Sequence, residues 1–277
     1  MVENGSDTFE LGSDLTVHRL GFGAMSLAGS NNTDWPDDPD GARRVAERAV
    51  ELGVDFIDTA DMYGNGSSEL IVGEALDVDR DDLVVATKGG ILKFHDGKVY
   101  RGDPPHLKTA AMRSKVRLRT DRIDLYQYHR PANGTPFEAS VEALADLKDG
   151  DVVEHVGLSN VSVEQLDRAR EITEIATVQN RYNVADRRHE DVLEYCESRG
   201  IGFMPYSPTK GLAERGEDLD AVAANHDATR RQIALAWLLE RSPVILPIPG
   251  TSSLEHLAEN VAASAIDLAG DEMARLE

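Results

Sequence analysis

Short apolar runs alternate along the chain with longer stretches in which apolar residues recur at helical spacing. The short runs lie at residues 19–24, 54–57, 83–87, 123–128, 155–158, 175–178, 201–205 and 244–248. They are apolar and often β-branched, which is typical of strands buried on both faces. The pattern therefore predicts eight strands of a parallel sheet.

Helical patterns occupy the intervals between these runs. They are predicted at residues 40–52, 104–119, 137–147, 162–172, 190–199 and 229–241. In the first of them Val45, Ala49 and Leu52 share one face, and Gly53 follows as a C-cap signal. Strands that alternate with helices predict an α/β fold with a parallel sheet.

Two α/β folds fit this alternation, the (β/α)₈ barrel and the doubly wound sheet. A doubly wound dinucleotide-binding sheet calls for Gly-x-Gly-x-x-Gly at an early strand-to-helix turn. Here Gly21 and Gly23 are followed by Ser26, so the pattern fails. We therefore predict a (β/α)₈ TIM barrel formed by residues 1–277 as a single domain, because a barrel of ~250 residues is commonly one domain.

The N-terminal segment is predicted to form a β-hairpin that covers the bottom of the barrel. Residues 9–11 and 15–17 are the apolar arms, and residues 12–14 form the turn. Residues 1–10 are polar and acidic, without the basic and apolar parts of a secretory signal. Residues 30–39 and 64–67 are predicted loops.

Composition narrows the classes of partner. The chain has 50 acidic and 29 basic residues and a net charge of −21, which repels nucleic-acid phosphates and anionic membranes. No apolar run approaches the ~20 residues that span a bilayer. We predict a cytoplasmic protein, and the scattered acids and scarcity of Lys resemble proteins of salt-loving organisms. The single cysteine, Cys196, excludes an internal disulfide and a cysteine-based metal site.

Polar residues follow almost every predicted strand. They are Asp58, Lys88, His129, Ser159, Asn160, Gln179, Asn180, Tyr206, Ser207, Gly250, Thr251 and Ser252. Taken alone, each has an ordinary explanation: an Asp caps a helix, a Lys is solvated, a His is packed. In a barrel, however, the C-terminal ends of all strands meet at one face, where the chemistry takes place. The repetition therefore predicts one shared pocket.

Four residues form a coherent acid–base group. A Tyr has an ordinary pKa of ~10, and a nearby ammonium lowers it. Lys88 can supply that ammonium to Tyr63, and an ionised Asp58 can orient Lys88. His129 can donate a hydrogen bond to a substrate carbonyl oxygen. Tyr63 is then the predicted general acid for reduction and general base for oxidation.

Several motifs resemble the aldo-keto reductase family. Residues 54–64 (VDFIDTADMYG) place Asp58 and Tyr63 five apart, residues 86–88 (ATK) resemble the lysine strand, and residues 122–129 (RIDLYQYH) resemble the histidine strand. Further matches are residues 155–160, 179–183, 206–208 and 248–251, so that the resemblance runs from about residue 20 to residue 261. It implies hydride transfer between a nicotinamide cofactor and a small-molecule carbonyl or alcohol, with no metal required.

The resemblance also implies a cofactor site across the top of the barrel. Its implied residues are Ser159, Asn160, Gln179, Tyr206, Ser207, Lys210, Gly250, Thr251, Ser252, Glu259 and Asn260. NADP(H) is favoured and NAD(H) stays open, because Ser252 and Ser253 stand where many relatives carry basic residues for the 2′-phosphate. Lys210 and Arg215 lie near enough in sequence to compensate. Residues 208–228 are shorter than the cofactor-covering loop of many relatives, which implies a more open site.

The substrate pocket is predicted from loop residues around the strand ends. These are Met25, Trp35, Met62, Phe94, Arg130 and Tyr182. Arg130 is interpreted as the partner of a nearby acid rather than of an acidic substrate. Two other functions stay open: a non-catalytic nicotinamide-binding regulatory subunit, and a barrel lyase that uses Lys88 as a Schiff base. A monomer or small homo-oligomer is expected.

Overall fold

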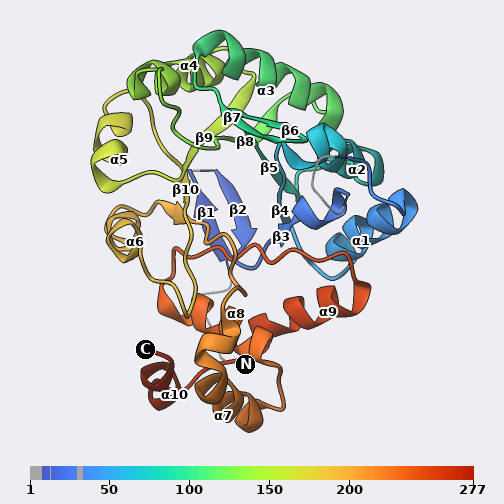
Figure 1. Ribbon diagram of the computed structural model, residues 1–277, viewed down its shortest axis with the longest axis vertical. Helices are drawn as coiled ribbons and strands as arrows, with labels where there is room; N and C mark the ends of the chain where they lie inside the picture. The colour runs from blue at the N-terminus through green and yellow to red at the C-terminus, as the bar shows by residue number, and fades with distance from the viewer. Residues whose placement is uncertain (1–7, 13, 30–33) are drawn as a thin grey trace.

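The computed structural model describes residues 8–12, 14–29 and 34–277. A parallel sheet with the strand order β11-β10-β9-β8-β5-β4-β3 curls around the core, and helices cover its outer side (Figure 1). Its strands are β3 (Phe22–Gly23), β4 (Phe56–Asp58), β5 (Val84–Gly89), β8 (Ile123–Tyr128), β9 (Val153–Ser159), β10 (Thr177–Gln179) and β11 (Gly202–Phe203). Seven of the predicted strands are therefore present, with shifted ends.

The eighth predicted strand, residues 244–248, closes the barrel without being a regular strand. On one side Phe203 N–H donates to the carbonyl of Val244 at 2.7 Å and Leu246 N–H donates to that of Phe203 at 2.8 Å. On the other side Gly21 N–H donates to the carbonyl of Pro247 at 3.0 Å. Pro247 and Pro249 have no N–H to donate, so a continuous ladder cannot form. The prediction of a (β/α)₈ barrel is confirmed, and the strand itself is reduced to an isolated bridge at Ile245.

Helices pack outside the strands in chain order. They are α1 (Pro39–Glu51), α2 (Ser67–Ala75), α3 (Pro104–Leu118), α4 (Phe137–Asp149), α5 (Val163–Arg170), α6 (Glu190–Glu197), α7 (Gly216–His226), α8 (Arg230–Arg241), α9 (Leu254–Ala262) and α10 (Gly270–Leu276). Local signals begin several of them: Asp38 and Asp103 cap α1 and α3 just before prolines, and Ser162 and Thr229 form capping boxes on α5 and α8. The six predicted helices are present.

Four helices and one hairpin lie outside the residue ranges predicted for helices and strands. Helix α2 starts at Ser67, directly after a 3₁₀ turn, η2 (Tyr63–Gly66), in the segment expected to be a loop. Helix α7 occupies much of residues 208–228, also expected to be a loop, and α9 and α10 follow the last predicted strand. An antiparallel hairpin, β6 (Ile91–Phe94) and β7 (Gly97–Tyr100), lies beyond the end of β5.

The predicted N-terminal hairpin is confirmed. Strands β1 (Thr8–Leu11) and β2 (Leu15–His18) pair antiparallel and lie within the ring of strands in Figure 1. Leu11 and Val17 are buried in one cluster with Phe56, Leu125 and Leu246 from the barrel strands. The hairpin therefore fills the bottom of the barrel with apolar side chains. Ser13 in its turn lies outside the described residues, as do residues 1–7 of the N-terminal segment and residues 30–33 of the predicted 30–39 loop.

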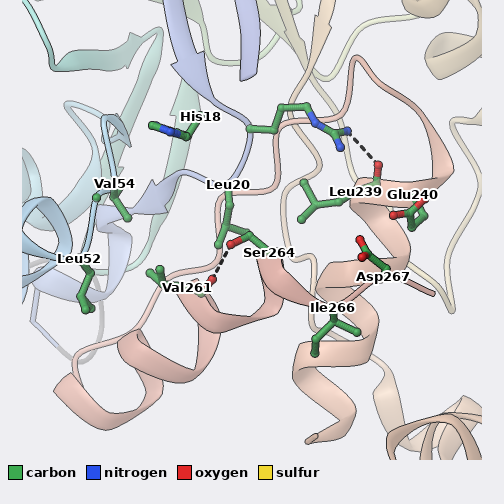
Figure 2. Close-up of a pocket in the computed structure, with 12 residues that line it drawn as sticks. His18, Leu20, Leu52, Val54, Leu239, Glu240, Val261, Ser264, Ile266 and Asp267 are labelled. Atoms are coloured by element: carbon green, nitrogen blue, oxygen red, sulfur yellow. Dashed lines mark hydrogen bonds between the residues drawn. The ribbon is translucent and has the colours of Figure 1, made fainter. Parts of the chain in front are cut away.

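A cavity of about 260 Å³ also lies at the bottom, where the chain enters β3 and β4 (Figure 2). Leu20, Leu52 and Val54 form part of its apolar wall, and Glu240 and Asp267 lie on the side formed by the end of α8 and the segment after α9. None of the predicted site residues lines it. Within the described part of the chain, no helix combines the length and the apolar character that crossing a bilayer requires.

Candidate active site

A buried ion pair lies at the C-terminal ends of β4 and β5. Lys88 is fully buried, and its Nζ lies 2.7 Å from both carboxylate oxygens of Asp58. The same ammonium donates to the carbonyl of Thr59 at 2.8 Å. Burial alone lowers the pKa of Lys88, but Asp58 and Tyr63 outweigh that effect and raise the pKa above its ordinary value. Lys88 is therefore a charged ammonium at neutral pH.

Tyr63 is brought over this pair by a loop tied to β5. Thr59 N–H donates to the carbonyl of Ala86 at 2.8 Å, and Asp61 N–H donates to that of Lys88 at 3.0 Å. The Tyr63 ring centroid then lies 5.2 Å from Lys88 Nζ. Burial raises the pKa of Tyr63 and Lys88 only partly opposes it, so the expected lowering is not the net result. The phenol is a proton donor at neutral pH.

His129 completes the group from the end of β8. Its ring stands perpendicular to that of Tyr63, with the two centroids 6.0 Å apart. Burial, together with the charges of Lys88, Lys98 and Arg130, holds the pKa of His129 well below its usual value. The imidazole is neutral at pH 7 and retains one N–H to donate. The structure thus brings together all four residues predicted to be catalytic.

Two glutamines that support Asp58 extend the predicted group. Gln127 Nε2 donates to Asp58 Oδ1 at 3.2 Å, and Gln179 Nε2 donates to the same oxygen at 3.0 Å. Gln127 was not predicted, although its place in β8 two residues before His129 puts it on the same face of that strand. Beneath the site the buried Glu69 accepts hydrogen bonds from Thr87 and Arg117. Lys88 and the two glutamines together orient the carboxylate of Asp58.

A cavity of about 420 Å³ opens above the group. Among its walls are Asp58, Tyr63 and His129, whereas Lys88 lies beneath them. Six of the residues implied for the cofactor also line it: Ser159, Asn160, Gln179, Tyr206, Ser207 and Gly250. The ends of strands distant in sequence therefore converge on one pocket, as predicted.

Asn160 is the most constrained residue on the cofactor side. Its backbone is left-handed, with φ at 61°, and Ser207 adopts a similar conformation. Its Nδ2 donates to Ser159 Oγ at 2.9 Å and to the carbonyl of His129 at 3.1 Å, while its Oδ1 accepts from Tyr206 Oη at 3.0 Å. Strained backbone of this kind costs energy and concentrates at functional sites. The side-chain amide of Asn160 is therefore held next to His129.

Asn260, which the resemblance implies for the adenosine end of the cofactor, is 1% exposed. Neither its Nδ2 nor its Oδ1 has a hydrogen-bond partner among the described residues. A buried amide without partners is expensive, which indicates a ligand that completes it. Nearby in the chain, Ser253 caps α9 by accepting a hydrogen bond from His256 N–H.

The other residues implied for this end differ in exposure. Thr251 is buried and accepts a hydrogen bond from Ser253 N–H, Glu259 is half-buried, and Ser252 and Lys210 are exposed. Arg215 is engaged elsewhere, with the carbonyl of Arg275 at 3.0 Å. Position 250 requires a glycine, because a Cβ there would lie only 2.6 Å from the carbonyl oxygen of Gly23.

Only half of the predicted substrate residues line the cavity. Met25, Met62 and Arg130 do so, together with Lys98 and Tyr100 from β7, which were missed because that hairpin was not expected. The other three predicted residues lie outside this cavity. Tyr182 is fully buried, stacks on Trp237 and donates to Glu190, because it packs between strands and outer helices. Trp35 and Phe94 are about half exposed and line none of the cavity.

Arg130 corrects another expectation. No ion pair joins it to an acid within the described part of the chain. Its Nη2 donates to Asn160 Oδ1 at 2.6 Å, and its guanidinium lies 5.7 Å from the centroid of the Tyr100 ring. Cys196 is buried, and burial raises the pKa of its thiol to about 12, so the thiol is a packed side chain and not a nucleophile.

Comparisons with known proteins agree with this geometry. The aldo/keto reductase family model matches residues 19–277. Pyridoxine 4-dehydrogenase of Escherichia coli (strain K12) is 40% identical over 281 residues, covering 98% of each chain. The structure of the thermostable aldo-keto reductase Tm1743 is 30% identical, with a TM-score of 0.87 over 97% of this chain and 98% of that one. An aldo/keto reductase of Klebsiella pneumoniae, solved with NADP and acetate, is 27% identical with a TM-score of 0.83, over 98% and 94% of the two chains.

The chain belongs to the aldo/keto reductase family. It is an NAD(P)H-dependent oxidoreductase that reduces aldehydes or ketones to alcohols by hydride transfer.

Proposed function

We propose that Tyr63 is the general acid of carbonyl reduction and that Asp58, Lys88 and His129 prepare it. The arrangement that carries the proposal is a protonated phenol over a buried Lys88–Asp58 pair, with a neutral imidazole at its side. His129 donates a hydrogen bond to the carbonyl oxygen and directs it to Tyr63 Oη. Tyr63 then protonates that oxygen, and the Lys88 ammonium stabilises the phenolate left behind.

The residues present fit a bound NADP(H). Ser159, Asn160 and Gln179 would hold the nicotinamide carboxamide, Tyr206 would lie against the ring, and Ser207 and Gly250 would meet the pyrophosphate. The unpartnered amide of Asn260 supports an adenosine end at α9, where Thr251 and Glu259 also lie. When bound, the cofactor supplies the hydride that reduces the carbonyl carbon.

The preference for NADP(H) over NAD(H) is part of the proposal. Solved relatives from Klebsiella pneumoniae contain NADP or NADPH. Ser252, Ser253 and the backbone N–H groups at the start of α9 would receive the 2′-phosphate. Lys210 is exposed and directly follows Thr209, which lines the cavity, and it is the one cation proposed to assist.

Small aldehydes and ketones are the proposed substrates. Pyridoxal belongs in the test panel because the Escherichia coli relative is named for pyridoxine. The Schiff-base lyase is disfavoured, because a lysine with a raised pKa is protonated and is a poor nucleophile. The regulatory alternative predicts binding of NADPH without turnover.

A spectrophotometric screen tests the proposal. NADPH and NADH are offered with aromatic and aliphatic aldehydes, in low and in molar salt, to the wild type and to Tyr63→Phe. We expect turnover by the wild type, faster with NADPH, and a loss of about 10²–10⁴-fold in the variant. Near-normal turnover by Tyr63→Phe contradicts the assignment, and NADPH binding without turnover favours the regulatory subunit.

Four further parts of the proposal rest on sequence. They are a single domain over residues 1–277, a cytoplasmic location, a monomer or small homo-oligomer, and origin in a salt-loving organism. Light scattering after size exclusion measures the oligomer. Full folding and activity without molar salt would count against the last of them.

A further inference from the structure

Two cations stand on the substrate side of the active-site cavity. The charged residues that line the cavity in the described part of the chain are Asp58, Lys98 and Arg130. Asp58 is already neutralised by Lys88 beneath it. The cavity wall therefore carries surplus positive charge in a protein whose net charge is −21.

Neither cation has an acidic partner within the described residues. Elsewhere ion pairs are common: Arg43, Arg122 and Arg230, for example, each lie within 3.5 Å of a carboxylate. Arg130 instead contacts the neutral groups of Asn160 and Tyr100. In a chain with such an excess of acids, cations without a carboxylate partner at the mouth of an active site require an explanation.

Lys98 is also placed at an energetic cost. In the β6–β7 hairpin it lies directly opposite Lys93, and like charges opposite one another destabilise a strand pair. Burial and then the charge of Lys98 lower the pKa of Lys93, which Asp34 partly offsets. The chain has only seven lysines, and two of them face each other beside the active site. A bound anion would relieve this repulsion.

Asn160 separates these cations from the proposed pyrophosphate site. Its Oδ1 accepts from Arg130 on one side and from Tyr206 on the other. Ser207 and Gly250, proposed for the pyrophosphate, follow on the Tyr206 side. Arg130 and Lys98 therefore face the space left for the substrate, close enough to His129 for both charges to act on its imidazole.

We propose that Arg130 and Lys98 bind an anionic group on the substrate, so that the preferred substrates are aldehydes or ketones that also carry a carboxylate or phosphate. The inference rests on the carbonyl reduction proposed above. The carbonyl lies at Tyr63 and His129, and the anion lies at the cavity mouth, where the guanidinium offers paired N–H donors. This local positive charge offsets the repulsion that the acidic surface exerts on an approaching anion.

Matched substrate pairs test the inference. 4-Carboxybenzaldehyde is compared with its neutral amide, 4-formylbenzamide, and succinic semialdehyde is compared with butanal, at saturating NADPH. We expect kcat/KM to favour the anion at least tenfold in one pair, chiefly through KM. Arg130→Gln should reduce that preference about tenfold and Lys98→Gln about threefold, because each should lower kcat/KM for the anion by that factor more than for its neutral partner.

Lys108→Gln is the control, since it removes an exposed lysine that pairs with Asp146 on the outer helices. Equal kcat/KM within both pairs, or a loss in Arg130→Gln shared equally by anion and neutral partner, overturns the inference and leaves the reductase assignment intact. A rise in KM for NADPH alone also overturns it, because the cations would then serve the cofactor. Absence of turnover with every aldehyde overturns the proposed function itself.

Discussion

The two ends of the barrel are built from the same strands but from opposite kinds of side chain. At the bottom, Leu11 and Val17 of the hairpin pack on Phe56 and Leu246 in a buried apolar cluster. At the top, the space is left open, and polar groups from five or more strands face it. Apolar burial stabilises the fold, whereas the open end keeps polar groups facing the space, among them two cations without an acidic partner in the described chain.

The two cavities differ in the charges that line them. The bottom cavity of about 260 Å³ is lined by basic and acidic side chains alike, His18 and Arg19 together with Glu240 and Asp267. His18 lies 2.7 Å from Asp55, and Arg19 donates to the carbonyl of Leu239. The top cavity of about 420 Å³ is lined by Arg130 and Lys98, which have no acidic partner in the described chain. Surplus positive charge beside the converging strand ends, rather than hollow space, distinguishes the top cavity.

The largest effect should follow from removing the ammonium at the top. Lys88→Met leaves Asp58 buried without its cation, which costs about 3–5 kcal/mol of folding free energy, and it deprives Tyr63 of its charge partner. We expect activity to fall by about 10²–10⁴-fold. The double variant Asp58→Asn/Lys88→Met, measured by chemical denaturation and turnover, should recover stability but not activity. A single variant as stable as the wild type would contradict the buried-pair argument.

A substitution that creates a void in the apolar cluster at the bottom should affect stability alone. Leu11→Ala removes a side chain that is 1% exposed, and we expect a loss of about 2–4 kcal/mol in the free energy of unfolding. Well below the melting temperature, kcat and KM should match the wild type. Met112→Ala on the exposed face of α3 is the control and should change little. Lost turnover in folded Leu11→Ala would show that the two ends are coupled.

The rates of carbonyl reduction and of alcohol oxidation should depend on pH in different ways. Because burial raises the pKa of Tyr63, the phenol stays protonated at neutral pH, and reduction should stay constant between about pH 6 and 9. Alcohol oxidation needs the phenolate, so its rate should rise up to about tenfold per pH unit over the same range. The lowered pKa of His129 keeps the imidazole neutral throughout. A reduction rate that falls as pH rises from 6 to 8 would show that the tyrosine titrates lower.

The smallest effect should appear at the adenosine end. Asn260 has no hydrogen-bond partner among the described residues, so Asn260→Ala should change the stability of the free protein by less than about 1 kcal/mol. It should raise Kd for NADPH by about 5–20-fold, the loss of one or two hydrogen bonds. Thermal shift with and without NADPH measures both quantities. An unchanged Kd would remove Asn260 from the cofactor site.

A helix, strand or site residue could be predicted from the sequence where its signal lies in a short stretch of neighbouring residues. The four proposed catalytic residues follow strand ends or a family spacing, and a barrel brings strand ends together by its topology. Helix α2 and the β6–β7 hairpin were missed because the glycines before α2 suggested a loop and the hairpin sits between a strand and a helix. Lys98 and Tyr100 were missed with it. Tyr182 was misplaced because a strand-end residue can point outward as well as inward.

By itself the sequence determined the barrel, the hairpin at its base and the identity of the polar residues at its top. The hydrophobic periodicity, the helix caps and the strand ends that predict them each depend on a short stretch of neighbouring residues. Only the tertiary structure decided how they act on one another. Burial raised the pKa of Tyr63 where an isolated Tyr–Lys pair suggested a lower one. The packing of the loops also placed Arg130 beside Asn160 rather than beside an acid. Desolvation and the choice of partner depend on every element packed around a group, and no local pattern encodes them.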